Sequence, residues 1–262
     1  MLLLLQRYFD VITLKQCKKC KFKDYYFISV MTTFITNTLI CPHCKNRMYS
    51  FEITSYFINK SEVFSDGKVD SDSPIPSDYK ILICSTCNKP FWKEEALLAD
   101  QKIDDSTTDL LEANNIPNLF PGFEEDHLQK HTIFYTDLLD MDFADTEEKE
   151  TYIRIKIWHL LNDRIRYQTS SVFSNLFEYH KKQTDSAKIK DLFKNNLLRL
   201  AKIYKPNTDE SQLLMAEMYR ELGDFENASY LLDSMDTKNN SAYQQIYEAS
   251  KRNKIKVFKL VK

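Results

Sequence analysis

Hydrophobic residues follow two different spacings along the chain. Arg47 to Ile58 (RMYSFEITSYFI) is rich in aromatic and β-branched residues, and Tyr79 to Ile83 is a short apolar run, so both predict strands. Between them, Ser65-Asp66-Gly67 is typical of a hairpin turn. Tyr25 to Ile40 has no charged residue over 16 positions, which is too short to span a bilayer, and we interpret it as strands. We expect β-structure in the front part of the chain.

The rear part has the spacing of amphipathic helices. Asp145 and Glu148 form a predicted capping box, and apolar residues from Tyr152 to Leu161 follow it. A polar break is expected at Thr184 to Ser186. Four later helices are predicted over residues 188–204, 209–222, 225–235 and 242–252. Because the turns between them are short, neighbouring helices should pack antiparallel.

The formal net charge of −2 hides three zones of opposite sign. Residues 1–93 carry a net charge of +5, residues 94–150 of −14 and residues 151–262 of +7. Within the acidic zone, Glu94 to Ala99 predicts a short helix, residues 100–123 look irregular and Glu124 to Met141 predicts a longer helix. The acidic middle would repel a phosphate backbone, so nucleic-acid binding by the whole chain is disfavoured.

Composition excludes some chemistry. The chain has only three glycines in 262 residues, so the glycine-rich loop of a nucleotide-binding enzyme cannot be built. No nucleophile with its base and no paired carboxylates at catalytic spacing are evident, and we expect no enzymatic activity. Gln6, Arg7 and Asp10 interrupt the apolar start before a signal peptide is complete, which predicts a cytoplasmic protein without membrane attachment.

All six cysteines occur in C-x2-C pairs, namely Cys17/Cys20, Cys41/Cys44 and Cys84/Cys87. Two thiolates on one tight turn can both bind a single Zn²⁺ at about 2.3 Å, and two such turns complete a tetrahedron. Strand-like sequence lies between the second and third pairs. We therefore predict one structural zinc ion bound by Cys41, Cys44, Cys84 and Cys87.

This arrangement resembles the zinc-ribbon family. The resemblance covers about residues 35–93 and rests on Cys41-Pro42-His43-Cys44-Lys45-Asn46 and Cys84-Ser85-Thr86-Cys87-Asn88-Lys89. It implies a closed four-thiolate site without a catalytic water. The 39 residues between the two pairs exceed the spacing of a compact ribbon, so an inserted hairpin or loop is expected there.

Other interpretations of the cysteines remain open. A ribbon of Cys17, Cys20, Cys41 and Cys44 has the commoner spacing. Alternatively, the functional chain begins at Met31, residues 1–30 are not native, and one complete cysteine set remains. Cys41-Pro42-His43-Cys44 is also identical to the active-site tetrapeptide of strongly oxidising thioredoxin-fold enzymes, which would make the protein a thiol-disulfide oxidoreductase.

The C-terminal helices resemble tetratricopeptide repeats. The resemblance rests on Met215-Ala216, Tyr219, Leu222-Gly223-Asp224-Phe225, Ala228, Leu232 and Met235. Partial matches lie 34 residues earlier and later, while Gln212 and Asn239-Asn240 depart from the pattern. The resemblance implies a concave surface that binds a protein or peptide. The basic tail Lys251 to Lys262 is interpreted as a solvated end, with an extension of this surface toward acidic partners as the alternative.

The sequence thus predicts an α+β protein with four segments. Residues 1–30 are an extension, 31–93 a zinc ribbon with an inserted hairpin, 94–144 an acidic helical linker, and 145–262 an all-α tetratricopeptide-like domain. We expect a non-catalytic zinc-binding adaptor that acts through protein–protein interaction. A nucleic-acid-associated zinc-ribbon protein is the second interpretation.

Overall fold

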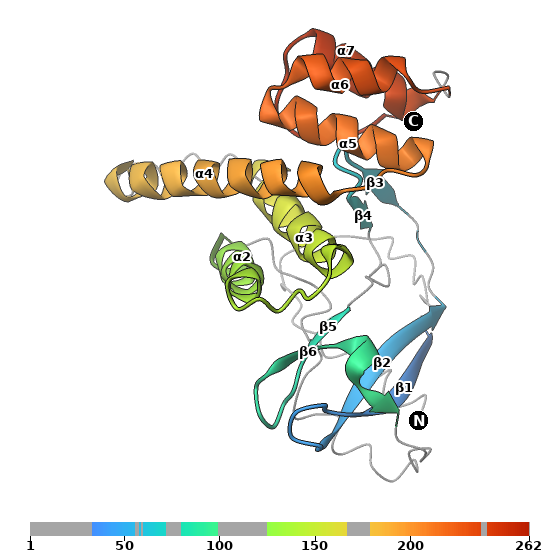
Figure 1. Cartoon of the computed structure of the whole chain (residues 1–262), viewed down its shortest axis with the longest axis vertical. Coiled ribbons are helices and arrows are strands. Elements are labelled where there is room, and N and C mark those ends of the chain that lie inside the picture. Colours follow the sequence, from blue (N-terminus) through green and yellow to red (C-terminus); the bar gives the residue numbers. More distant parts are fainter. Residues whose placement is uncertain are drawn as a thin grey trace, which may run out of the picture.

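The computed structural model describes residues 33–55, 58, 60–71, 80–98, 125–166, 179–236 and 240–261. Small antiparallel sheets make up its front part and six α-helices follow in the described remainder, an α+β arrangement (Figure 1). The predicted N-terminal extension with Cys17 and Cys20, and the irregular residues 100–123, lie outside the described residues.

One three-stranded sheet and two two-stranded sheets form the described β-structure. β1 (Thr33–Ile40) pairs with β2 (Arg47–Ser55) on one side and with β7 (Leu97–Leu98) on the other. β3 (Ser61–Val63) pairs with β4 (Val69–Ser71), and β5 (Ile81–Ile83) pairs with β6 (Pro90–Trp92). All pairs are antiparallel, and a short connection joins the strands of the β1–β2, β3–β4 and β5–β6 pairs. The predicted strands are confirmed at Thr33–Ile40, Arg47–Ser55 and Ile81–Ile83, as is the hairpin turn at Ser65-Asp66-Gly67, whereas residues 25–32 of the first predicted segment lie outside the described residues.

One short helix was predicted wrongly. Glu94 to Ala99 contains only a 3-10 turn, η1 (Lys93–Glu95), and the chain then returns to the extended conformation. Leu97 and Leu98 pair with Ile40 and Leu39 at the edge of β1. Backbone hydrogen bonds to an open strand edge therefore outweigh the helical preference of this segment.

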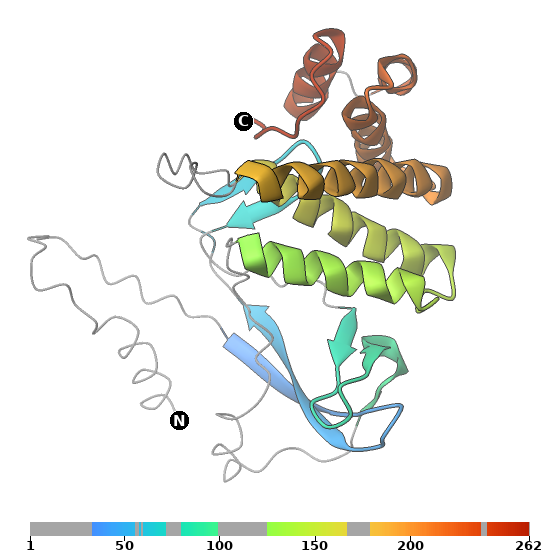
Figure 2. The same ribbon diagram turned by 90° about the vertical axis from the view of Figure 1, so that its left-hand side faces the viewer.

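The helices stack in chain order. They are α2 (Glu125–Asp140), α3 (Glu147–Arg166), α4 (Tyr179–Ile203), α5 (Asp209–Leu222), α6 (Phe225–Asp233) and α7 (Ser241–Lys251). Figure 2 shows α2, α3 and α4 in successive layers above the β1–β2 hairpin, with α5 to α7 beyond them. Trp158, Leu197, Leu200 and Met218 form a buried cluster where α3, α4 and α5 meet.

Two helix boundaries differ from the prediction. Helix α4 runs without interruption through Thr184 to Ser186, because these residues each cost only about 0.5 kcal/mol in a helix and no glycine or proline is present. Helix α3 begins at Glu147 rather than after Asp145, and the hydroxyl of Thr146 accepts a hydrogen bond from the Lys149 amide at 3.2 Å. Ile133 of α2 and Met141, which follows its last residue, are 48% and 62% exposed.

The start and end signals of α5 agree with the sequence. The Thr208 hydroxyl accepts from the Ser211 amide at its N-terminus. Gly223 ends the helix with φ of 79°, a left-handed conformation that favours glycine. Asp224 then caps α6 by accepting from the Asn227 amide. Ala216 and Ala228 are fully buried, which allows α5 and α6 to pack closely. The repeat type itself stays a prediction.

The inserted hairpin β3–β4 docks on the helices rather than on the ribbon. In Figure 1 it lies just below α5 and above β1 and β2. The fully buried carboxylate of Asp66 pairs with Arg166 of α3 and accepts from the Asn162 amide at 2.9 Å. Lys68 reaches Asp163 at 2.7 Å. The tip of the hairpin is thus held by buried polar contacts to α3.

The basic tail contributes an extended segment to this hairpin. The Ser65 amide donates to the Phe258 carbonyl at 2.9 Å, and the Leu260 amide donates to the Val63 carbonyl at 2.8 Å. Val257 is 8% exposed. The prediction of a wholly solvated end is therefore wrong for residues 257–260, because the free edge of β3 provides backbone partners that local sequence does not reveal.

Candidate metal centre

The first knuckle connects β1 to β2. The Cys41 amide donates to the Asn46 carbonyl at 2.9 Å, and the Lys45 amide donates back to the Cys41 carbonyl at 3.1 Å. Lys45, directly after Cys44, has φ of 62°. This left-handed residue reverses the chain within four positions, so both sulfurs face the same side of the turn.

The second knuckle, between β5 and β6, has the same geometry. The Cys84 amide donates to the Lys89 carbonyl at 3.0 Å, and the Asn88 amide donates to the Cys84 carbonyl at 2.9 Å. Asn88 follows Cys87 and has φ of 55°, a conformation that asparagine tolerates better than most residues. The two turns therefore present two equivalent pairs of thiols.

The four sulfurs of Cys41, Cys44, Cys84 and Cys87 lie within 4.8 Å of one another. Sγ of Cys41 is 3.9 Å from Sγ of Cys87, and Sγ of Cys44 is 3.6 Å from Sγ of Cys84. A disulfide needs about 2.05 Å, and all four cysteines are free. An ion bound at about 2.3 Å to four tetrahedral sulfurs would space them about 3.8 Å apart. The four cysteines are thus positioned to hold one metal ion, and the geometry fits zinc.

Apolar side chains enclose the sulfurs. Cys41 and Cys84 are buried with Leu39, Met48 and Phe91 in one hydrophobic cluster. Such an environment limits access of water to the cysteine sulfurs and stabilises a metal–thiolate centre against exchange. Phe91 is fully buried in this cluster and packs against the cysteines.

A histidine joins the two knuckles. His43 Nε2 lies 3.0 Å from the Pro90 carbonyl oxygen, and its ring packs edge-on against Phe91 at 6.5 Å between centroids. The side chain is exposed and is not among the four potential ligands. His43 is therefore an exposed side chain that makes a structural contact which its sequence position does not reveal.

The pKa values of two of the thiols shift in opposite directions. Burial opposes ionisation of Cys84, but hydrogen bonds from the backbone of Cys87 and Thr86 and from nearby sulfurs lower its pKa to about 6. The Asn46 backbone favours ionisation of Cys44, yet burial and the other three sulfurs raise its pKa to about 11. Opposite pKa shifts are expected for neighbouring thiols, because ionisation of one thiol opposes ionisation of the next. A divalent cation that bound all four sulfurs would displace their protons.

The structure bears on the rival interpretations. It brings together the four cysteines that we favoured, while Cys17 and Cys20 lie outside the described residues. A thioredoxin-type site requires a helix beginning at Cys44, whose N-terminal dipole stabilises the thiolate. Here a turn follows Cys44 and strand β2 begins at Arg47. The helix-dependent activation of a CPHC redox site is absent at this position.

Comparison of the chain with protein-family models, curated proteins and solved structures finds no match. The ribbon-like character of the module therefore rests on its own two knuckles and their spacing. Among the described residues, no helix combines the length and the apolar character that crossing a membrane requires.

Proposed function

We propose that the protein is a non-catalytic zinc-binding adaptor. The observation that supports the zinc site is the meeting of four buried or half-buried sulfurs from two equivalent knuckles. Four thiolates fill the tetrahedral coordination of Zn²⁺ and leave no position for water or substrate. The ion would therefore stabilise the front of the molecule, and recognition would fall to the helices.

The helical part supplies the surface for recognition. Helices α5, α6 and α7 pack successively around the buried cluster of Ala216, Leu232 and Ile246. This arrangement is compatible with the tetratricopeptide resemblance, whose members bind proteins or peptides. On α6, Tyr230 is 73% exposed, and exposed tyrosines are common at protein interfaces. We assign partner binding to this part of the molecule.

Metal analysis tests the zinc site. Purified wild-type protein should contain one zinc per chain by inductively coupled plasma mass spectrometry. Cys41→Ser and Cys84→Ser should lose the metal, because each leaves an incomplete set of thiolates. Cys17→Ser, the matched control, should retain it. A metal-free wild-type protein that is fully folded with four free thiols would overturn the proposal.

Affinity capture with nuclease treatment tests the adaptor role. A protein partner should remain bound in stoichiometric amount after nuclease digestion and in 0.5 M salt. Contacts to nucleic-acid phosphates would instead weaken steeply as salt rises. A partner that disappears after nuclease treatment would favour the nucleic-acid-associated interpretation over the adaptor.

A further inference from the structure

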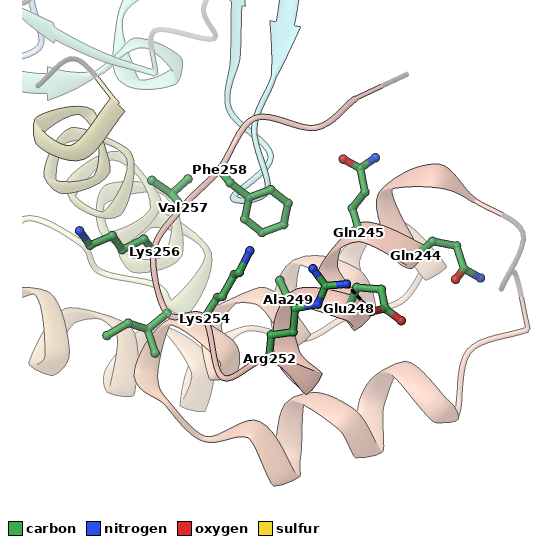
Figure 3. A pocket seen from close by; sticks show the side chains of 10 residues that line it. Gln244, Gln245, Glu248, Ala249, Arg252, Lys254, Lys256, Val257 and Phe258 are labelled. Atoms are coloured by element: carbon green, nitrogen blue, oxygen red, sulfur yellow. Dashed lines mark hydrogen bonds and ion pairs between the residues drawn. The ribbon is translucent and has the colours of Figure 1, made fainter. Parts of the chain in front are cut away.

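A groove of about 620 Å³ lies between α7 and the segment 254–258 that follows it (Figure 3). Ala249 and Val257 contribute buried apolar surface, and the half-buried ring of Phe258 lies at its centre. Its volume falls in the range of about 300–1,000 Å³ that is common for binding sites. The sequence offered a contact with acidic partners only for the basic tail as a whole, and it did not indicate this groove.

The rim of the groove is basic. Arg252, Lys254 and Lys256 line it and are all exposed, whereas Glu248 is its single acidic residue. Glu248 lies 3.4 Å from Arg252 in an ion pair whose side chains are both more than half exposed. Among the described residues, no carboxylate is paired with Lys254 or Lys256. An excess of positive charge therefore surrounds an apolar floor.

One wall of the groove is the segment 254–258, and α5 fixes the position of its backbone. The guanidinium of Arg220 is fully buried and donates to the carbonyls of Lys254 and Lys256, the latter at 3.1 Å. Glu217 pairs with Arg220 from the same helix. Because the backbone of the wall faces inward to α5, its lysine side chains are left for solvent or a ligand. A groove of fixed shape loses little conformational entropy on binding.

We propose that this groove binds an acidic segment of a partner protein. An apolar side chain of the segment would pack on Phe258, and flanking carboxylates would approach Lys254, Lys256 and Arg252. Complementary charge supports this occupant, since the rim offers three cations against one carboxylate. The inference rests on the adaptor function above and names the chemistry of its partner.

A defined peptide tests the groove. The probe is a fluorescein-labelled twelve-residue peptide in which Asp and Glu alternate with Leu and Phe, and its control replaces the acids by Asn and Gln. Fluorescence anisotropy should show binding of the acidic peptide to the zinc-loaded full chain. We expect at least tenfold weaker binding of the neutral peptide, and at least tenfold weaker binding of the acidic peptide to the double variant Lys254→Glu with Lys256→Glu.

Two further variants locate the effect. Lys188→Glu with Lys190→Glu changes exposed lysines of α4 and should leave the affinity within twofold of wild type. Ile255→Ser alters a 54% exposed residue of the groove and should weaken binding about threefold without unfolding the chain. Circular dichroism and zinc content confirm that each variant is folded.

Two outcomes would overturn the groove. One is that the wild-type protein does not bind the acidic peptide. The other is that Lys188→Glu with Lys190→Glu lowers the affinity as much as Lys254→Glu with Lys256→Glu does. Equally tight binding of a twelve-nucleotide oligothymidine that is lost in the same variants would show a general polyanion surface and would also overturn it. The adaptor role is judged separately by the nuclease-resistant partner, so the two proposals can fail independently.

Discussion

The carboxyl group of Glu221 is buried between α3 and α5. Burial chiefly, and then repulsion from Glu217 and Asp66, raise its pKa well above the usual value. The indole N–H of Trp158 donates to it at 2.7 Å, and the cation of Arg220 lies 3.8 Å away, but these contacts only partly offset the rise. The folded protein therefore binds a proton here that the unfolded chain releases near pH 4.5.

This shift makes stability fall as pH rises. The folded state binds more protons than the unfolded state above pH 4.5, so the free energy of unfolding decreases by up to about 1.4 kcal/mol per pH unit until the raised pKa is passed. Glu221→Gln should remove this slope and be more stable than wild type at pH 8, with little advantage at pH 5. Urea unfolding at both pH values measures it. Glu226→Gln, at an exposed position on α6, should change neither value.

Gly67 lies at the tip of the β3–β4 hairpin with φ of 79°. A Cβ there would lie 3.2 Å from Leu214 Cδ1 on α5. Gly67→Ala should lower the free energy of unfolding by about 2–3 kcal/mol, of which about 1–2 kcal/mol comes from the left-handed backbone. Gly223→Ala has the same φ and its nearest contact at 4.0 Å, so it should cost only the backbone part. Equal decreases in the free energy of unfolding, measured with urea, would show that the hairpin tip is not in tight contact with α5.

At the scale of elements, strand β6 connects two cores. Successive side chains of a strand point to opposite faces. Phe91 packs with the cysteines, whereas Trp92 packs with Leu138, Ile153 and other residues of α2 and α3. The Trp92 indole N–H donates to the Phe143 carbonyl at 3.2 Å, and the two rings stack at 5.3 Å. Two consecutive residues of β6 thus belong to different cores, Phe91 to the metal module and Trp92 to the helical core.

Substitutions at these two positions should separate metal binding from helix packing. Trp92→Ala should lose about 3–5 kcal/mol of stability by leaving a cavity under α2 and α3, while zinc content stays at one per chain. Phe91→Ala opens the cluster around the sulfurs, so a chelator should remove zinc faster than from wild type. Zinc release to a colorimetric chelator and urea unfolding distinguish the two. A large rise in the zinc-release rate for Trp92→Ala alone would contradict this division.

The sequence predicted the elements that have local signals, but it did not predict which elements pair with one another. Apolar spacing and Gly223 predicted α5 with its observed bounds, because these signals act within a few residues. The two cysteine knuckles were likewise readable from their spacing. The pairing of β7 with β1 and of residues 258–260 with β3 was missed, since long-range backbone pairing depends on which strand edge the fold leaves open.

At the scale of the whole molecule, the described parts of the β-structure and of the helices meet in two regions. Trp92 makes one contact with α2 and α3, and the β3–β4 hairpin makes the other with α3 and the C-terminal segment. Both originate from the part of the chain that lies between or beside the cysteine pairs. Loss of the metal should therefore weaken helix packing as well as the knuckles.

The two tryptophans can report on this coupling. Trp92 lies where β6 packs against α2 and α3, and Trp158 lies where α3, α4 and α5 meet, so Trp92→Phe and Trp158→Phe leave one fluorescent reporter within the helices and one at the boundary with the metal module. Both reporters should give the same urea midpoint in the zinc-loaded protein, and chelation should lower both midpoints together. Two separate transitions, with only the Trp92 signal sensitive to chelation, would show that the two parts unfold independently.

The hydrogen bond between Phe258 and Ser65 spans 193 positions of the chain, which bears on how the protein is made. While the ribosome is still translating, the turn bearing Asp66 has neither Arg166 of α3 nor the last extended segment to contact. Contacts between residues so far apart form slowly and leave nascent apolar surface open to aggregation. Newly synthesised chains should therefore depend on chaperones until the segment around Phe258 has emerged.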